Sequence, residues 1–381
     1  MNRVFIQLIK IVLIICLIVF FGCNEVSVRF EVTVQENPES VFITGNHQEL
    51  GIWDPGQVEM KKLSDSLFTH QIDVESGTNL EYKFTRGSWD TEAIYGTDII
   101  PGNHILTVRK DTTVVHTVKK WRDSLVLNYE SITGSVVYHA DFYSPELNNN
   151  RTVIVWLPPF YEKRTEMRYP VLYMHDGQNI INSQTSYIGA EWKADETITQ
   201  LVETGEIEEI IVVGLYNTED RRAEYSPMHN GKKYSEFLVK TVKPFIDNTY
   251  RTKPGRESTA VMGSSMGGII SFHLVWDYPH IFSRAGCLSP AFLVDNNEIV
   301  TRVRSSRTAP EEILLYMDNG TVGLEKEFQP ALDDMNSALE EKGFDGSNLF
   351  YKIFEGAIHN EVAWAERLHL PLLFFFGKQD L

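Results

Sequence analysis

The sequence is poor in cysteine and in basic residues, and both shortages narrow the choice of function. Its 381 residues include only three cysteines, and 35 basic residues stand against 52 acidic ones, for a net charge of −17. A surface of this sign disfavours nucleic acid and anionic lipid as main partners, because both need basic patches. The remaining composition, 43% hydrophobic with seven tryptophans, is typical of packed globular domains, and the length suits two of them.

The longest apolar run, residues 11–21, is shorter than a membrane span and has the length of a signal-peptide core. Gly22-Cys23 ends the run. A small residue before a cysteine resembles a bacterial lipoprotein cleavage site, although the two phenylalanines before it depart from the usual pattern. The sequence therefore predicts a lipoprotein-type signal peptide over 1–23, a lipid on Cys23, and an exported, membrane-anchored protein in the periplasm or on the cell surface. The alternative is an uncleaved N-terminal anchor.

The cysteines that remain exclude a disulfide framework. Cys16 would be removed with the signal peptide and Cys23 would carry the lipid, which leaves only Cys287. One thiol makes no intramolecular disulfide, and the apolar run around Cys287 predicts a buried core position. No cysteine–histidine cluster has the spacing of metal ligands, so the sequence predicts no metal site.

Residues 24–125 have the pattern of an all-β domain. Short runs with alternating apolar residues are separated by turn clusters such as Asp54-Pro55-Gly56. This spacing predicts a small antiparallel β-sandwich. The expected strands are 26–34, 40–44, 67–74, 80–84, 104–108 and 112–118.

From residue 133 to 381 the pattern changes to strands that alternate with helices, after a linker near 120–132. Such alternation implies right-handed crossovers and a mostly parallel sheet, so we predict the α/β class. The expected strands are 136–142, 152–157, 171–174, 210–215, 260–262, 285–288, 313–316 and 350–354, and the expected helices are 194–203, 234–245, 269–277, 326–341 and 361–373.

The segment Gly263-Ser264-Ser265-Met266-Gly267 fits the G-x-S-x-G nucleophile elbow. An apolar run precedes it and a helix-compatible run follows it, which is the strand–turn–helix setting that lifts a serine hydroxyl above a parallel sheet. The glycines permit the sharp turn, because a Cβ there would clash with the neighbouring strand and helix. Ser265 is therefore the predicted nucleophile. The alternative is a glycine- and serine-rich turn that merely links a strand to a helix.

A serine hydroxyl needs a base, and the base needs a third group that holds its tautomer. In the α/β-hydrolase order of serine, acid and histidine, His359 is the predicted base, because it directly follows the last expected strand. His273 and His369 lie within expected helices and would not easily reach over the strand tips. The acid should follow the penultimate strand, where Asp318 and Glu325 both qualify.

An oxyanion hole needs two backbone N–H groups. We assign one to Met266, the residue after the nucleophile. The loop after the strand 171–174 should supply the other, which we assign to Gln178.

Four segments resemble the putative esterase family, which includes esterase D, feruloyl esterases and siderophore esterases. They are YMHDGQN (173–179), RRAEY (221–225), NTYRT (248–252) and GSSMGG (263–268). The resemblance covers about 133–378 and implies an α/β-hydrolase fold and serine ester hydrolysis without a cofactor. Many relatives carry an aspartate at the position of Gly323 and others an acid at the position of Glu325, so Glu325 is preferred to Asp318 as the triad acid.

The N-terminal module resembles starch-binding carbohydrate-binding domains through GN (45–46), LGIW (50–53), EYKF (81–84) and Trp89. In that family two tryptophans stack on glucosyl rings and a lysine bonds a sugar hydroxyl. The resemblance implies Trp53, Trp89 and Lys83 in these roles and an α-glucan as partner. The alternatives are tryptophans packed in the sandwich core and a module that is a spacer.

Together these features predict a serine esterase that acts on acyl or feruloyl-type esters of a glycan or glycoside. Two other classes of protein remain possible from the sequence. A non-catalytic surface glycan-binding lipoprotein would keep the module and tolerate a dead triad, although Ser265 and His359 argue against it. An acyltransferase would use the same triad but exclude water.

Overall fold

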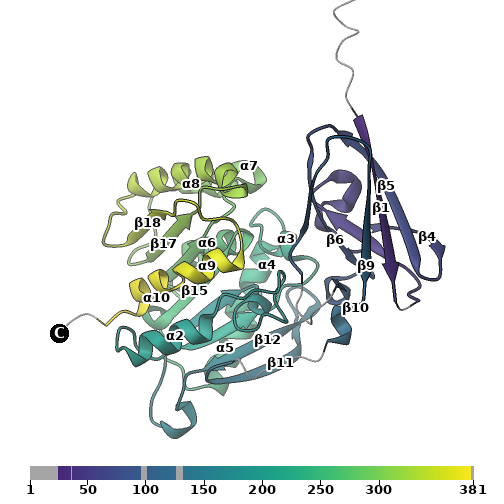
Figure 1. Cartoon of the computed structure of the whole chain (residues 1–381). Coiled ribbons are helices and arrows are strands. Elements are labelled where there is room, and N and C mark those ends of the chain that lie inside the picture. The colour runs from purple at the N-terminus through teal and green to yellow at the C-terminus, as the bar shows by residue number, and fades with distance from the viewer. Residues whose placement is uncertain (1–24, 36, 96–100, 126–131, 379–381) are drawn as a thin grey trace, which may run out of the picture. The chain divides into compact units, whose positions relative to one another are not determined.

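The computed structural model describes residues 25–378 except 36, 96–100 and 126–131. The chain splits into two compact units, Met1–Val126 and Leu127–Leu381 (Figure 1). The expected signal peptide with Cys23, and part of the expected linker, lie outside the described residues. Within the described ranges no helix is long and apolar enough to span a bilayer.

The first unit is a sandwich of two four-stranded sheets, as predicted. Its β-strands bury every second residue, such as Val28, Phe30 and Val32 of β1, because successive side chains of a strand point to opposite faces. One pairing differs from the antiparallel expectation, since β1 and β9 run parallel. The sheets have the orders β4-β5-β1-β9 and β3-β2-β6-β8, and β7 pairs with β10. The bounds are β1 Glu25–Val34, β2 Phe42–Gly45, β3 Val58–Glu59, β4 Lys61–Ser64, β5 Leu67–Glu75, β6 Asn79–Thr85, β7 Ala93–Ile94, β8 His104–Thr107, β9 Thr112–Val118 and β10 Lys120–Trp121.

The second unit has one eight-stranded sheet in the order β11-β12-β14-β13-β15-β16-β17-β18. The β11–β12 and β12–β14 pairs are antiparallel and the other pairs are parallel, which confirms the predicted mostly parallel sheet. The bounds are β11 Ser135–Ser144, β12 Asn149–Leu157, β13 Val171–His175, β14 Ile211–Leu215, β15 Thr259–Ser264, β16 Arg284–Leu288, β17 Leu314–Asn319 and β18 Leu349–Ile353.

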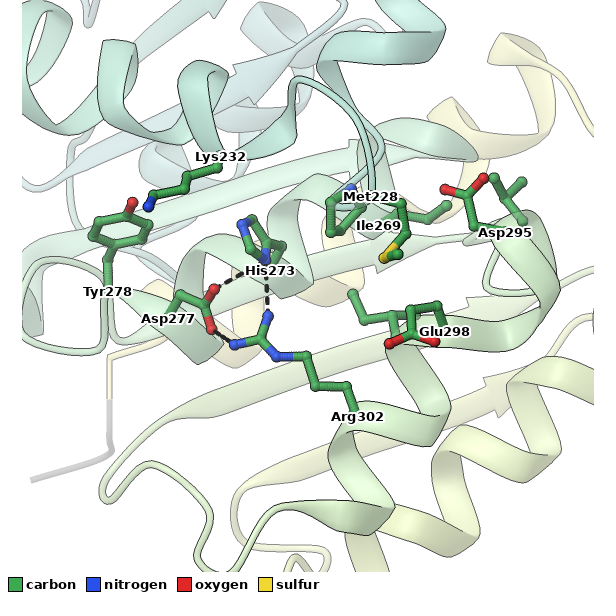
Figure 2. Close-up of a pocket in the computed structure, with 12 residues that line it drawn as sticks. Met228, Lys232, Ile269, His273, Asp277, Tyr278, Asp295, Glu298 and Arg302 are labelled. Atoms are coloured by element: carbon green, nitrogen blue, oxygen red, sulfur yellow. Dashed lines mark hydrogen bonds and ion pairs between the residues drawn. The ribbon is translucent and has the colours of Figure 1, made fainter.

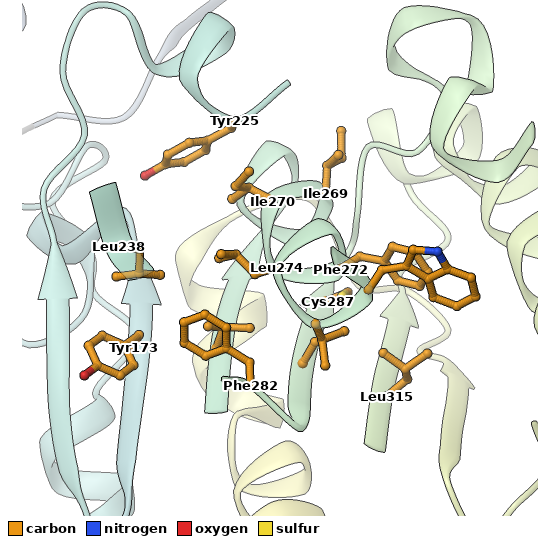
Figure 3. Close-up of a cluster of buried hydrophobic side chains, with 14 of the residues drawn as sticks. Tyr173, Tyr225, Leu238, Ile269, Ile270, Phe272, Leu274, Phe282, Cys287 and Leu315 are labelled. Atoms are coloured by element: carbon orange, nitrogen blue, oxygen red, sulfur yellow. The ribbon is translucent and has the colours of Figure 1, made fainter. Parts of the chain in front are cut away.

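Helices cover both faces of this sheet. Residues of α4 to α8 belong to one core cluster, and residues of α2, α9 and α10 to the other. Figure 3 shows the first cluster around α6, where Cys287 is buried as predicted. The bounds are α2 Ala194–Glu203, α3 Arg221–Glu224, α4 Gly231–Glu236, α5 Lys243–Thr249, α6 Met266–Asp277, α7 Val294–Ser305, α8 Leu324–Glu340, α9 Glu361–Arg367 and α10 His369–Phe376.

Two expected helices are interrupted, and two helices, the short α3 and α7, were not expected. The expected helix 234–245 contains a π-helical turn over Phe237–Val242, and the expected helix 361–373 breaks at Leu368 between α9 and α10. The unexpected helix α7 starts at Val294, and the next three residues, 295–297, all have positive φ and are not helical. Aspartate and asparagine are typical of turns, so this stretch gave no helical signal.

The strand order changes direction at β13, which makes this position a topological switch point. The chain runs from β13 to β14 on one side and then returns to β15 on the other side. Loops that leave the carboxyl ends of two such strands diverge, and ligands of α/β folds bind at this switch point. The loop 176–179 after β13 and the turn at Ser265 after β15 lie there.

Candidate active site

Ser265 occupies a strained turn between β15 and α6. Its φ of 56° and ψ of −122° fall in a region that non-glycine residues rarely adopt. A Cβ on Gly263 would lie 2.8 Å from the Gly267 carbonyl carbon, so the strand end and the helix start approach too closely for larger residues. The Ser265 amide donates to the Leu288 carbonyl (3.0 Å), and its carbonyl accepts from the Ala291 amide (3.1 Å). The segment after β16 therefore holds the strained turn in place.

His359 faces Glu325, the carboxylate at the start of α8. His359 Nδ1 lies 3.4 Å from Glu325 Oε2, and both atoms are buried. Neither atom has a hydrogen-bond partner elsewhere in the described part of the chain. The imidazole packs edge-on against Phe328 and Trp364, with ring centroids 5.0 and 4.9 Å apart. These contacts fix the ring with Nδ1 toward the carboxylate and leave Nε2 on the opposite side.

Ser289 orients the Glu325 carboxylate. Its hydroxyl lies 2.6 Å from Glu325 Oε1. The hydroxyl oxygen of Ser289 itself accepts hydrogen bonds from Trp364 Nε1 (3.0 Å) and Arg367 Nη2 (2.8 Å). Because indole and guanidinium groups only donate, the Ser289 proton is left for Glu325. The hydroxyl is thus an obligatory donor to the carboxylate.

Asp318 has a different environment from Glu325. It lies within β17, fully buried, and accepts from Arg367 Nε (3.0 Å) and Nη2 (3.1 Å). The Tyr316 hydroxyl also donates to it (2.8 Å). Its oxygens are therefore committed to an internal ion pair. Of the two candidate acids, Glu325 is the one that contacts His359.

The loop after β13 is held by Asp176, whose backbone is left-handed with φ of 57°. Arg221 makes two hydrogen bonds of 2.7 Å to this carboxylate, and Asn217 Nδ2 donates at 2.6 Å. Burial alone would raise the pKa of Asp176, but Arg221 and Asn217 outweigh it and hold that pKa below its ordinary value. The Asp176 amide is occupied, since it donates to the Tyr225 hydroxyl (3.2 Å).

This loop lies against the first turn of α6. A Cβ on Gly267 would be 3.4 Å from Asp176 Oδ2. Met266 is the first residue of α6, where the amide has no partner within the helix. Gln178 lies in the short 3-10 turn Gly177–Asn179 of the loop, and its side-chain oxygen accepts from the Asn217 amide (3.2 Å). The two predicted oxyanion donors thus come from segments that lie together.

A further contact links the same loop to the segment that follows His359. Asn179 Nδ2 donates to Glu361 Oε1 (3.1 Å). Asn360 caps α9 by accepting from the Ala363 amide (3.0 Å). The position of the histidine loop is therefore coupled to that of the loop after β13.

In the first unit, Trp53 and Trp89 lie together. Their ring centroids are 6.5 Å apart and their planes differ by 35°. Both side chains are half-buried, so neither is part of the sandwich core. They come from the 3-10 turns Gln48–Trp53 and Trp89–Thr91.

Lys83 differs from its predicted role. Only 1% of the residue is exposed, and its ammonium donates to the Glu92 carboxylate and to the Pro101 carbonyl (2.9 Å). An ammonium enclosed and paired in this way does not present its hydrogens to a surface sugar. Lys83 is therefore a structural residue of the module rather than a sugar ligand.

Among the described residues, no group of three or more histidine, cysteine, aspartate or glutamate side chains would hold a metal ion.

Comparison with known proteins agrees with both units. Residues 144–375 match the family described as Putative esterase, and residues 25–118 match the family described as Starch binding domain. The esterase match spans more than half of the chain. The chain therefore belongs to the putative esterase family, as its motifs predicted, and it is a carboxylic ester hydrolase of the serine class.

Three proteins that match the catalytic unit are between 21% and 26% identical to this chain. The uncharacterized protein YbbA of Bacillus subtilis is 21% identical over 248 residues, which are 60% of this chain and 94% of YbbA. An endo-1,4-beta-xylanase/feruloyl esterase of Xylanibacter ruminicola is 26% identical over 237 residues, 60% of this chain and 30% of that protein. The solved structure of a ferulic acid esterase shares the fold with a TM-score of 0.54 at 22% identity, covering 64% of this chain and 98% of that one.

Proposed function

We propose that Ser265, His359 and Glu325 form the catalytic triad of this esterase. The observation that carries the proposal is the contact between His359 Nδ1 and Glu325 Oε2, two buried atoms that have no other hydrogen-bond partner among the residues the structure describes. A carboxylate in that position accepts the Nδ1 proton and keeps Nε2 free to act as a base. The strained turn at Ser265 is the second support.

In the proposed mechanism, His359 Nε2 takes the hydroxyl proton while Ser265 Oγ attacks the ester carbonyl. The amides of Met266 and Gln178 stabilise the negative oxygen that forms. The intermediate collapses as the C–O bond to the alcohol breaks, and His359 returns its proton to the departing alkoxide. Water then attacks the acyl-enzyme with the same base, and Ser265 is released with the free acid.

We further propose that the substrate is an acyl or feruloyl-type ester of a glycan or glycoside. Two observations support this class: the starch-binding family match on the same chain and the similarity to a protein named as a xylanase and feruloyl esterase. The test is release of acid from a panel of acetylated polysaccharides, feruloylated oligosaccharides and p-nitrophenyl esters. Transfer of the acyl group to an added alcohol, seen by mass spectrometry with little free acid, would instead favour an acyltransferase.

The tryptophan pair should bind α-glucan by stacking on the apolar faces of glucosyl rings. In the full chain, we expect Trp53→Ala and Trp89→Ala each to weaken binding of maltoheptaose about fivefold, which corresponds to about 1 kcal/mol for one aromatic contact. Ile105→Ala is the control, because Ile105 is 74% exposed on strand β8, away from the two 3-10 turns that carry the tryptophans, and this variant should bind maltoheptaose as wild type does. Isothermal calorimetry decides the matter, and no heat with any of several α-glucans would mark the module as a spacer.

We also propose that the protein is exported and anchored through a lipid on Cys23. In a bacterial host, we expect Cys23→Ala to abolish incorporation of labelled palmitate and to shift the protein from the membrane to the soluble fraction. Cys16→Ala, in the part of the sequence expected to be removed, should leave labelling intact. Unlabelled wild-type protein that stays in the membrane fraction would favour an uncleaved anchor.

A further inference from the structure

A pocket of about 330 Å³ lies between α4, α6 and α7 (Figure 2). Charged side chains border it at both ends, with Lys232 and Asp277 at one end and Asp295 and Glu298 at the other. The described residues that line it include none of the three members of the proposed triad. The part of a substrate that lies next to the triad therefore contacts a different surface.

Four large apolar side chains beside the proposed triad are exposed to solvent. They belong to two short segments, one that leads into Glu325 and one that surrounds His359. The structure describes eleven exposed large apolar residues in the second unit, and four of them lie within three positions of Glu325 or His359. Single exposed apolar residues are normal, but a group of them at one place indicates a binding surface. This group, called the apolar rim below, consists of Val322, Leu324, Ile358 and Val362, which are 42% to 48% exposed.

The two segments of the apolar rim lie side by side. The Thr321 and Val322 amides both donate to the Ala357 carbonyl, at 3.1 and 3.2 Å. The Asn360 amide donates to the Ile358 carbonyl (3.1 Å), so the chain turns at Ile358 just before α9 begins. The exposed side chains of both segments therefore belong to one surface.

The segments of the apolar rim are almost free of charge. Residues 320–324 read Gly-Thr-Val-Gly-Leu and residues 356–360 read Gly-Ala-Ile-His-Asn, so His359 is the one titratable side chain among them. The rest of the sequence is rich in charge, with 23% charged residues and a net charge of −17. An uncharged, aliphatic surface favours an uncharged, apolar occupant, because contact between them removes apolar area from water.

Phe328 connects the apolar rim to the imidazole of His359. The two rings pack edge-on, with centroids 5.0 Å apart. Leu324 precedes Phe328 by four residues in α8, and residues at this spacing share one side of a helix. Phe328 is buried whereas Leu324 is exposed. The apolar rim thus begins where the packing around the imidazole ends.

The proposed mechanism decides which part of the ester lies there. His359 returns its proton to the departing alkoxide, so His359 Nε2 must come within hydrogen-bond distance of the alcohol oxygen. The acyl group is bonded to Ser265 at that stage. The surface next to His359 is therefore the one that the alcohol part of the ester reaches.

We propose that the apolar rim is the alcohol subsite of the esterase, and that it selects esters whose alcohol part carries an alkyl or aryl group. The inference rests on the proposed function, because it takes His359 as the group that protonates the leaving alcohol. Among the substrates of that function, the subsite favours the ester of a glycoside with an apolar aglycone over the ester of a plain polysaccharide.

The test uses hexyl acetate and methyl heptanoate, two isomers that carry the same alkyl chain on opposite sides of the ester, with methyl acetate as the reference. We expect the wild-type kcat/KM for hexyl acetate to exceed that for methyl acetate about thirtyfold, because five further methylene groups are each about half buried. No such preference in wild type overturns the alcohol subsite.

The double variant Leu324→Gln/Val362→Gln makes the apolar rim polar at two exposed helical positions, where glutamine is a good helix former. We expect the ratio of kcat/KM for hexyl acetate to that for methyl acetate to fall about fivefold, since half of the apolar side chains are lost. The ratio for methyl heptanoate to methyl acetate should stay as in wild type. Met167→Gln, at a residue 42% exposed outside the apolar rim, is the control and should change neither ratio.

The other outcomes of this test contradict the proposal. An unchanged hexyl acetate ratio in the double variant, or an equal fall of both ratios, overturns the assignment to the alcohol. Sedimentation velocity distinguishes a second copy of the chain as the occupant. If wild type is a dimer, the double variant is a monomer and the hexyl acetate ratio is unchanged, the apolar rim is a contact between copies instead.

Failure of the alcohol subsite is distinguishable from failure of the proposed function. If Ser265→Ala does not hydrolyse methyl acetate and the double variant keeps the wild-type hexyl acetate ratio, only the subsite is wrong. If Ser265→Ala retains hydrolysis of methyl acetate, the proposed triad fails and the subsite argument fails with it.

Discussion

Ser265→Ala should lower kcat for ester hydrolysis by about 10⁴- to 10⁶-fold, as removal of a serine nucleophile does in comparable triads. The attacking oxygen is lost while the turn keeps its shape, because alanine has the same Cβ at φ of 56° and ψ of −122°. The thermal midpoint of unfolding should therefore stay close to that of wild type. Steady-state hydrolysis of a p-nitrophenyl ester measures the effect.

Ser264→Ala is the matched control for this prediction, since the adjacent serine ends β15 and is itself buried. It should retain most of the activity. Near wild-type hydrolysis by purified Ser265→Ala, with host esterases excluded, would rule out Ser265 as the nucleophile.

Glu325→Gln should lower kcat by about 10⁴-fold, as the same change does in other triads. The new carboxamide would still accept from Ser289 through its oxygen, but its NH₂ group would face His359 Nδ1. A donor in that position stabilises the tautomer that carries the proton on Nε2, which cannot act as a base. The pH dependence and size of kcat measure the loss, and the thermal midpoint should change little.

Asp318→Asn is the matched comparison, because it makes the same chemical change at the other candidate acid. It leaves the buried Arg367 charge without a full partner, and breaking such a pair costs about 3–5 kcal/mol. For a protein of this size we expect a thermal midpoint lower by roughly 10 °C, with a smaller loss of kcat than in Glu325→Gln. A larger loss of kcat in Asp318→Asn would reassign the catalytic acid.

The parts of the site that were predictable from sequence are those with local patterns. The turn around Ser265 follows from glycines within five residues, and the strands before it follow from short apolar runs. Chain order after a strand was sufficient to nominate His359 as the base and both Asp318 and Glu325 as the acid, and the resemblance to the putative esterase family then favoured Glu325. The strands and helices around the sheet were predictable for the same reason, because the alternation of apolar residues in a strand and their spacing in an amphipathic helix are patterns that extend over only a few residues.

The contacts that were missed join residues far apart in sequence. Ser289 and Glu325 are separated by 36 positions, and Arg221 and Asp176 by 45. No local pattern indicates such pairs. The segment RRAEY (221–225) contains Arg221, but it does not identify Asp176 as the partner. Lys83 was predicted to bond a sugar because it stands in the segment EYKF (81–84), which resembles the starch-binding domains. Its buried partner Glu92 was not predicted, because no local pattern around Glu92 indicates an ion pair.

The parallel pairing of β1 with β9 has a mechanical consequence. Val28 lies opposite Thr112 and Val34 opposite Val118, so the chain enters β1 at one end of the module and leaves β9 at the other. With about 3.3 Å per residue, the two attachment points are separated by about 30 Å. A pull applied to the chain before Glu25 and after Val118 would slide the two strands past each other. All the hydrogen bonds of the ladder would then share the load, whereas a hairpin pulled at its open end breaks them one after another.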